Sequence, residues 1–520
     1  MLQVFFLAFF FQAAQPYDIL ILNGTVVDGS GGPWFRADVG IRAGRIAAIG
    51  KLGEAAATTR IDAKGRIVSP GFIDIHTHAR RGIFEDSAAQ NYIRQGVTTL
   101  IEGNDGSSPI PLAPFFSKLA STPIAVNFGS FAGQGSIRQQ VTGLENRKAT
   151  PTEIDRMKDI ARQAMLDGAL GMSTGLFYVP GNFTPTEEVV EIAKVFGAMG
   201  GMHISHMRDE AADITKSVAE TIRIGEEGGL PTQVTHHKII GAANWGKSTD
   251  TLRQVADARE RGVDATIDMY PYTASSTGTA ALFPQWSLAG GAKALNERLA
   301  APEQHQKIKA AIVTNIIENR GGGDPKNIVM ASCSFNPAYD GKSLAQITSE
   351  SGRTPTAANA ADTAIDIQGK GGCSAVYHAI SEDDVMRVLR SPLSMIGSDG
   401  EIPQFGKGAP HPRSYGTFAR VLSRYVRDRR TITLEDAVFK MAGFPAQRLK
   451  LFDRGLLRLG MRADVAVFDL GKVRDLATFE KPHQYATGFT DVIVNGKAVI
   501  LDGKLTSERP GMVLYGPAKR

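Results

Sequence analysis

Short apolar runs alternate with longer amphipathic stretches through the middle of this chain. Strand-like runs lie at 72–75, 96–101, 124–127, 169–172, 202–204, 233–235, 265–268, 328–330 and 394–396, with helical periodicity at 152–166, 186–199 and 211–227. Repeated β-then-α units predict a parallel sheet, and about eight of them predict an α/β fold of the closed (β/α)8 type over residues 69–430. Residues 280–325 break the rhythm and predict a helical insertion that acts as a lid over the barrel mouth.

Both ends of the chain are rich in short strands instead. Residues 16–68 alternate apolar runs with turns, including the hairpin signal Asn23-Gly24. Residues 431–520 repeat this pattern after a lead-in helix. Two β-rich ends that flank an unlike middle predict one small β-sandwich domain built from both.

Composition adds few constraints. The chain has 520 residues, of which 42% are hydrophobic and 21% charged, with a net charge of +5, all ordinary for a globular protein. Basic residues within 413–430 have the spacing of a solvated helix face and no aromatic interleaving, so we predict no nucleic-acid partner. The only cysteines, Cys333 and Cys373, lack a C-x-x-C spacing and predict no disulfide framework.

The N-terminus carries an apolar run at 4–11, followed by small residues. This resembles a secretory signal peptide at 1–15 and is too short to span a bilayer. It favours a periplasmic or secreted protein without stable membrane insertion after signal removal, and a cytoplasmic one if the segment is not a signal.

Polar residues recur where the predicted strands end. His76 and His78 close the first strand and share a face, because side chains alternate along a strand. The later strand ends carry Glu102, Asp105, His203, His206, His236, His237, Lys238, Tyr270 and Asp399, and Arg413 lies in a following loop. Since these ends converge on one mouth in a barrel, we expect the side chains to meet there. Histidine and carboxylate ligands suit zinc, and a carboxylate can bridge two ions.

From Ile19 to about Met512 the chain resembles the N-acyl-D-amino-acid deacylase (D-aminoacylase) branch of the amidohydrolase superfamily. The matching segments are G-F-I-D-I-H-T-H (71–78), G-V-T-T (96–99), S-T-G-L-F-Y-V-P-G (173–181), H-M-R-D-E (206–210), T-H-H-K (235–238), Y-P-Y (270–272), G-S-D-G (397–400) and H-P-R-x-Y-G-T-F (411–418). The resemblance implies a metal-dependent amidohydrolase that releases a carboxylate and a D-amino acid from an N-acyl-D-amino acid.

The resemblance also implies residue roles. One or two divalent ions, zinc first, would be held by His76, His78, His206, His236 and Asp399. Asp399 would also be the general base, and Arg413 the clamp for the substrate carboxylate. Further substrate-lining residues would be Lys238, Tyr178 and Tyr270, with Ser275 as a weaker candidate.

Three points leave alternatives open. The family commonly has Cys as the bridging ligand where this chain has Asp105; a carboxylate can also bridge, so Asp105 is the predicted metal ligand there, and Glu102 on the same loop is a rival for that place. Lys238 could instead be an interior lysine paired with a carboxylate, and Tyr270 simple packing at the mouth. We interpret His203 and His237 as structural, and His411 as shaping the loop that holds Arg413.

Other functions fit part of the pattern. A cyclic-amide hydrolase of the dihydroorotase or hydantoinase kind usually has a carboxylated lysine between its metals, and no lysine lies at the second-strand position here. A dipeptidase acting on D-residues is a further alternative. A catalytically inactive scaffold is a more remote one. The oligomeric state is left open.

Overall fold

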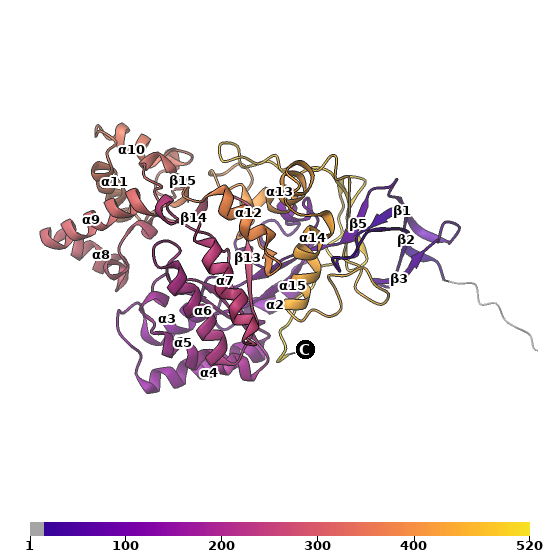
Figure 1. Cartoon of the computed structure of the whole chain (residues 1–520), viewed down its shortest axis with the longest axis horizontal. Helices are drawn as coiled ribbons and strands as arrows, with labels where there is room; N and C mark the ends of the chain where they lie inside the picture. The colour runs from indigo at the N-terminus through magenta and orange to yellow at the C-terminus, as the bar shows by residue number, and fades with distance from the viewer. Residues whose placement is uncertain (1–14, 520) are drawn as a thin grey trace, which may run out of the picture.

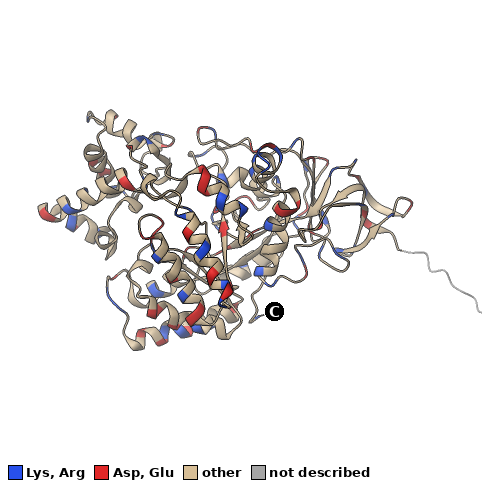
Figure 2. Cartoon of the chain, viewed as in Figure 1, with Lys and Arg blue, Asp and Glu red and all other residues tan. Residues whose placement is uncertain are grey.

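The computed structural model describes residues 15–519 (Figure 1). The predicted signal segment 1–15 lies outside the described residues except for Gln15. Among residues 15–519, none of the helices combines the length and the apolar character needed to cross a bilayer. Acidic and basic residues are interspersed along the ribbon (Figure 2).

Parallel strands form the centre of the molecule. Two sheets contain them, with the orders β6-β7-β8 and β17-β13-β12-β11-β10-β9. The strands are β6 (Phe72–Asp74), β7 (Val97–Glu102), β8 (Asn127–Ser130), β9 (Ala132–Gly133), β10 (Gly171–Gly175), β11 (Met202–His206), β12 (Thr232–Val234), β13 (Ala265–Met269) and β17 (Ser394–Ile396).

The two sheets join into a closed barrel. On one side β8 runs directly into β9, so a single stretch of chain pairs with both β7 and β10. On the other side Thr77 and Gly400 form a parallel bridge, in which the His78 N–H donates to Gly400 O (2.6 Å) and the Asp399 N–H to His76 O (2.7 Å). The first and last strands therefore meet, which confirms the predicted (β/α)8 fold.

Helices connect most of these strands. A Thr150–Glu153 capping box begins α4, and Gly168 in the left-handed conformation ends it. The helices around the barrel are α1 (Gln90–Ile93), α2 (Ala113–Ser121), α3 (Gln134–Thr142), α4 (Pro151–Asp167), α5 (Thr186–Ala198), α6 (Ile214–Gly228), α7 (Ser248–Glu260), α12 (Glu382–Arg390) and α13 (Arg413–Arg420), which continues as a π-helix over Val421–Asp428.

The lead-in helix is placed differently from the prediction. Residues 434–448 form α14 (Leu434–Val438), a π-turn (Phe439–Gly443) and α15 (Phe444–Arg448), and this segment packs against β6 and β17 of the barrel. The boundary between barrel and β domain therefore lies later than residue 430.

The chain ends build one β domain, seen at the right of Figure 1. Its sheet has the order β21-β20-β19-β18-β5-β1-β2-β3, with β4 also paired to β1. Asn23-Gly24 is not a hairpin turn, because β1 continues through it with a register shift. The strands are β1 (Tyr17–Val26), β2 (Phe35–Arg42), β3 (Arg45–Gly50), β4 (Ala57–Asp62), β5 (Ile67–Pro70), β18 (Val465–Phe468), β19 (Phe489–Val494), β20 (Lys497–Leu501) and β21 (Lys504–Leu505).

The insertion is larger than the predicted 280–325 segment. It begins at β14 (Ser275–Gly278) and ends at β16 (Ser374–Tyr377), and its own apolar core includes Ile308, Ile312 and Tyr377. The run at 328–330, predicted as a barrel strand, is part of β15 (Ile328–Ser332), which pairs antiparallel with β16. Its helices are α8 (Gly291–Ala300), α9 (Pro302–Glu318), α10 (Leu344–Glu350) and α11 (Ala357–Gly369).

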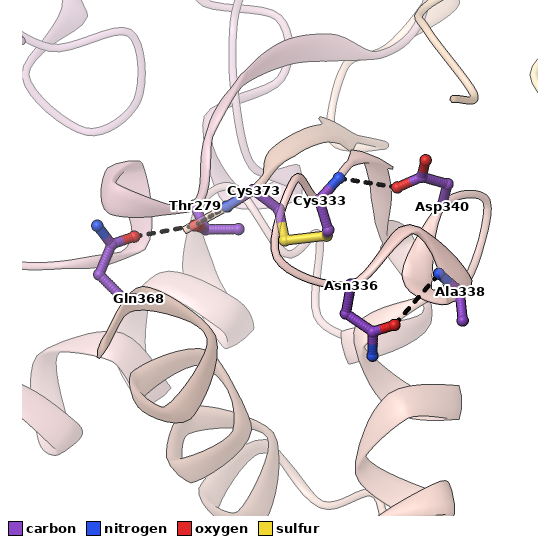
Figure 3. Close-up of a disulfide and its surroundings, with 7 residues drawn as sticks. All are labelled: Thr279, Cys333, Asn336, Ala338, Asp340, Gln368 and Cys373. Carbon is purple, nitrogen blue, oxygen red and sulfur yellow. Dashed lines mark hydrogen bonds between the residues drawn. A yellow bond between two sulfur atoms is a disulfide. The ribbon is translucent and has the colours of Figure 1, made fainter. Parts of the chain in front are cut away.

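A disulfide joins Cys333 to Cys373 within this insertion (Figure 3). This single bond was not predicted, because it depends on the pairing of β15 with β16, which brings together two cysteines that lie 40 residues apart. The Cys373 N–H donates to Thr279 Oγ1 (3.0 Å), and the Cys333 N–H to Asp340 Oδ1 (2.8 Å). The disulfide thus links the segment after β15 to the segment before β16, and the two hydrogen bonds hold Asp340 and Thr279 beside it.

Breaking this bond should destabilise the insertion. Closing a loop of this length restricts the unfolded chain by about 4 kcal/mol in the chain-entropy account. The double variant Cys333→Ser/Cys373→Ser should therefore melt at a lower temperature and exchange amide hydrogens faster in α8–α11. A melting curve that matches wild type, with unchanged exchange in these helices, would contradict this expectation.

Candidate metal centre and substrate cavity

Four histidines and two aspartates meet where the barrel strands end. One group is His76, His78, Asp105 and Asp399, and the other is Asp105, His206 and His236. In each group one possible ligand atom per residue lies within 4.8 Å of all the others. These are the predicted metal residues, and Asp105 is common to both groups.

The carboxylate of Asp105 lies between the two groups. Its Oδ2 is 3.3 Å from Nε2 of His78, and its Oδ1 is 3.4 Å from Nε2 of His76. The same Oδ1 is 3.3 Å from Nε2 of His236 and 3.8 Å from Nδ1 of His206. Asp105 thus faces histidines of both groups.

The donor atoms fit a divalent metal. Nε2 of His76 and Oδ1 of Asp105 are buried and have no hydrogen-bond partner within residues 15–519. Buried polar atoms are normally paired, so these atoms indicate an interaction that the protein itself does not supply. Imidazole nitrogens and carboxylate oxygens, with no thiolate among them, suit zinc and related divalent ions.

Backbone strain concentrates at three of these residues. Asp105, His236 and Asp399 have φ angles of +55°, +35° and +52°. Non-glycine residues in this region cost of order 1–3 kcal/mol each, and such residues cluster at functional sites. All three residues lie in loops that follow barrel strands.

Electrostatics keep the carboxylates ionised. Burial favours the neutral acid, but Arg413 and His78 outweigh it and hold the pKa of Asp399 well below its usual range. Burial likewise opposes protonation of His78, but Asp105 and Asp399 raise its pKa to about 9. A metal would compete with this proton, because only a neutral imidazole can be a ligand.

Sequence reasoning missed two supporting carboxylates. Asp268 lies with Oδ1 3.4 Å from Nδ1 of His76 and accepts the His236 N–H (2.7 Å). Glu210 lies behind His206 and His236. Glu210 could have been noticed in the H-M-R-D-E segment, but no spacing rule distinguishes it from a solvated acid.

Glu102 does not join the cluster. Its Oε2 accepts the Arg80 N–H (3.0 Å), and its Oε1 lies 3.1 Å from Nη1 of Arg80. The rival for the bridging place is therefore held by an arginine, while Asp105 faces the histidines.

A cavity of about 740 Å³ opens beside the centre. Among the predicted residues, His78, Asp105, His206 and Asp399 line it on the metal side. The predicted substrate-lining residues in its wall are Tyr178, Lys238, Ser275 and Arg413. The insertion adds further wall residues, including Thr277, Arg320, Ser332 and Ser374, the last two of which adjoin the disulfide.

Arg413 is the cation nearest the candidate base. Its Nη1 lies 2.7 Å from Oδ2 of Asp399, and its guanidinium stacks 4.9 Å from the ring centre of Tyr270. Tyr270 is buried against Arg413 and is not among the residues that line the cavity, and its hydroxyl has no hydrogen-bond partner in the described part of the chain. His411 accepts the Arg413 N–H (3.0 Å), which fits its predicted role in shaping this loop.

Lys238 is paired with a carboxylate, as the structural alternative predicted. Its Nζ lies 2.5 Å from Oε1 of Glu210, and it also lines the cavity. Tyr178 shares a hydrogen bond with Thr277 (3.1 Å), which joins the barrel to the insertion. Both predicted substrate residues are thus held by neighbours at the cavity wall.

His203 and His237 lie outside the cluster. His203 shares hydrogen bonds with Thr174 (2.9 Å) and Thr232 (2.8 Å), and His237 with Thr251 (2.8 Å). These partners are what we expect of structural histidines.

Acid should weaken the fold through His203. Burial, with a smaller contribution from Arg448, lowers its pKa from 6.5 to about 3. The unfolded chain binds a proton in this range and the folded chain does not, so this stabilisation is complete above about pH 6.5 and lost as the pH falls toward 3. Urea unfolding of wild type should lose about 2 kcal/mol more between pH 7 and pH 5 than that of His203→Gln. Equal losses would contradict this expectation.

Comparisons with known proteins agree with this geometry. The sequence profile of the amidohydrolase family matches residues 59–500. A D-aminoacylase of Alcaligenes xylosoxydans xylosoxydans is 37% identical over 96% of this chain and 98% of its own. An N-acyl-D-glutamate deacylase of the same organism is 35% identical over 96% and 97%. The crystal structure of N-acyl-D-glutamate deacylase from Bordetella bronchiseptica, complexed with zinc and a phosphonate inhibitor, has a TM-score of 0.82 and 33% identity, covering 96% of this chain and 100% of that one.

Proposed function

The chain belongs to the amidohydrolase family, in its D-aminoacylase branch, and on that premise we propose that it hydrolyses N-acyl-D-amino acids. The products would be a carboxylate and a D-amino acid. The observation that carries the proposal is the pair of clusters bridged by Asp105, with Arg413 beside them in one cavity. A hydrolytic centre for an amide thus lies next to a cation for a free carboxylate.

The metal residues are proposed from their geometry. Zinc, in one or two ions, would be held by His76, His78, Asp105, Asp399, His206 and His236. Zinc in relatives of this kind is supported by the Bordetella enzyme. When bound, such an ion lowers the pKa of water and polarises a carbonyl group.

Asp399 is the proposed general base. Its carboxylate lines the cavity, where it can accept a proton from the attacking water. It would return this proton to the leaving nitrogen, which departs as the amine of the D-amino acid. The ring of Tyr270 would help to hold Arg413 in place by stacking on its guanidinium.

Arg413 is the proposed clamp for the substrate carboxylate. A guanidinium can donate two parallel hydrogen bonds to a carboxylate, which a lysine cannot match in geometry. Lys238 and Tyr178 would line the rest of the substrate from the cavity wall. The preference for the D-hand rests on the family alone.

The test is metal content together with hydrolysis of paired N-acetyl-D- and N-acetyl-L-amino acids. We expect zinc at about one to two equivalents and release of amine from the D-series only. Equal turnover of both hands, or turnover of cyclic amides or dipeptides alone, would reject the proposed substrate. A protein without metal or turnover would support an inactive scaffold.

We also propose that the protein acts outside the cytoplasm. Disulfides persist in oxidising compartments, and the Cys333–Cys373 bond supports export. Cell fractionation with thiol labelling would test this. Recovery of the chain in the cytoplasm with both thiols reduced would reject it.

A further inference from the structure

Glu210 is a buried carboxylate that the proposed steps do not use. Its side chain is 1% exposed, and its two oxygens face different histidines. Oε1 lies 3.3 Å from Nδ1 of His236, and Oε2 lies 3.8 Å from Nε2 of His206. These ring nitrogens point away from Asp105, because Nε2 of His236 and Nδ1 of His206 are the ones that face it.

A histidine that binds a metal through one ring nitrogen carries its proton on the other, and that N–H needs an acceptor. We infer that Glu210 is a positioning residue whose one carboxylate accepts the outer N–H of both His206 and His236. It would thereby fix the ring orientation and the tautomer that this metal position requires. The inference rests on the proposed metal-dependent function and is independent of the substrate.

Lys238 contacts both groups of the proposed hydrogen bond between His236 and Glu210. Its Nζ lies 2.5 Å from Oε1 of Glu210 and 2.7 Å from Nδ1 of His236. An ammonium group only donates, so the second contact requires Nδ1 without a proton and places the proton on Nε2, which faces Asp105. That tautomer cannot bind a metal through Nε2.

The two arrangements exclude each other. With a metal on Nε2, the proton of His236 lies on Nδ1 and is donated to Glu210. Lys238 then keeps its ion pair with Glu210 and turns from the histidine toward the cavity that it lines. Arg320, with Nη2 3.5 Å from Oε2, supplies a second positive charge beside the same carboxylate. Glu210 thus links metal binding to the position of a cavity lysine.

The test measures metal affinity instead of turnover. In a His78→Ala background, which removes a ligand that belongs only to the other cluster, metal-free protein is titrated with Zn²⁺ against a chromophoric chelator. Glu210→Gln should raise the Kd about 10–100-fold, because its amide has one acceptor oxygen for two N–H groups. Glu210→Asp, which keeps a carboxylate, should recover part of the affinity.

Two variants separate this role from a purely structural one. Glu210→Gln/Lys238→Met removes the unbalanced lysine charge, and a folded protein with a raised Kd would support the inference. Lys238→Met alone should lower the Kd, because the competing donor is gone. The control is Glu102→Gln, which removes another buried carboxylate, one that contacts Arg80. This variant should leave the Kd for Zn²⁺ unchanged.

An unchanged Kd in folded Glu210→Gln, or a raised Kd in Lys238→Met, would overturn the inference. Failure to hydrolyse N-acyl-D-amino acids would overturn only the proposed function and leave this titration readable.

Discussion

Replacing Asp399 by asparagine should lower kcat for N-acetyl-D-amino acids by about 10²–10⁴-fold, the usual contribution of a positioned acid–base group. Asparagine keeps the size of the side chain and one oxygen near His78, but it cannot take up a proton. The cluster of Asp105, His206 and His236 does not contain Asp399, so binding of a metal there should survive. Steady-state kinetics together with metal analysis would measure both effects.

A matched control is Asp475→Asn. Asp475 also pairs with an arginine, Arg420 (2.9 Å), but it is not among the residues that line the cavity. This variant should keep kcat, which separates the loss of a base from the general loss of an arginine-paired carboxylate. Wild-type turnover in Asp399→Asn would remove Asp399 from the mechanism.

Replacing Asp105 by alanine should have an effect of similar size for a different reason. Both clusters share this carboxylate, so its removal takes a ligand from each at once. We expect the zinc that remains after dialysis to fall well below that of wild type. Loss of metal activation, worth several kcal/mol in the transition state, should lower kcat/KM by about 10³-fold or more.

The comparison variant here is His78→Ala, which belongs to one cluster only. It should retain the metal of the His206 and His236 position and lose less zinc than Asp105→Ala. Equal zinc contents in the two variants would mean that Asp105 does not bridge. Metal analysis by mass spectrometry, paired with circular dichroism to verify folding, would decide between these outcomes.

Much of the barrel could be predicted because its signals are local. Short apolar runs, helical periodicity and histidines at strand ends can all be recognised within short segments of the sequence. The same holds for the metal cluster, since the carboxyl ends of parallel strands converge wherever such a barrel forms. The choice between Asp105 and Glu102 as the bridging ligand was harder to predict. The two carboxylates lie three residues apart on one loop, and only the folded loop decides which of them faces the histidines.

The failures all depend on long-range pairing. Asn495-Gly496 joins β19 to β20, whereas Asn23-Gly24 lies inside β1, because the strand on either side of it pairs with β2. The run at 328–330 has the composition of a barrel strand but finds an antiparallel partner in β16. The disulfide depends on the pairing of β15 with β16, and the proposed role of Glu210 depends in part on His236 and Lys238, the latter 28 positions further along the chain.

The closure of the barrel has a consequence for the order of events during synthesis. His78 follows the first barrel strand and Asp399 follows the last, and their side chains lie 3.0 Å apart although 321 positions separate them in the sequence. A nascent chain that has not yet emerged past Asp399 therefore lacks one residue of the group His76, His78, Asp105 and Asp399, and it cannot close the ring of strands. Binding of a metal that needs all four of these residues would thus be a late step, which follows translation of most of the polypeptide.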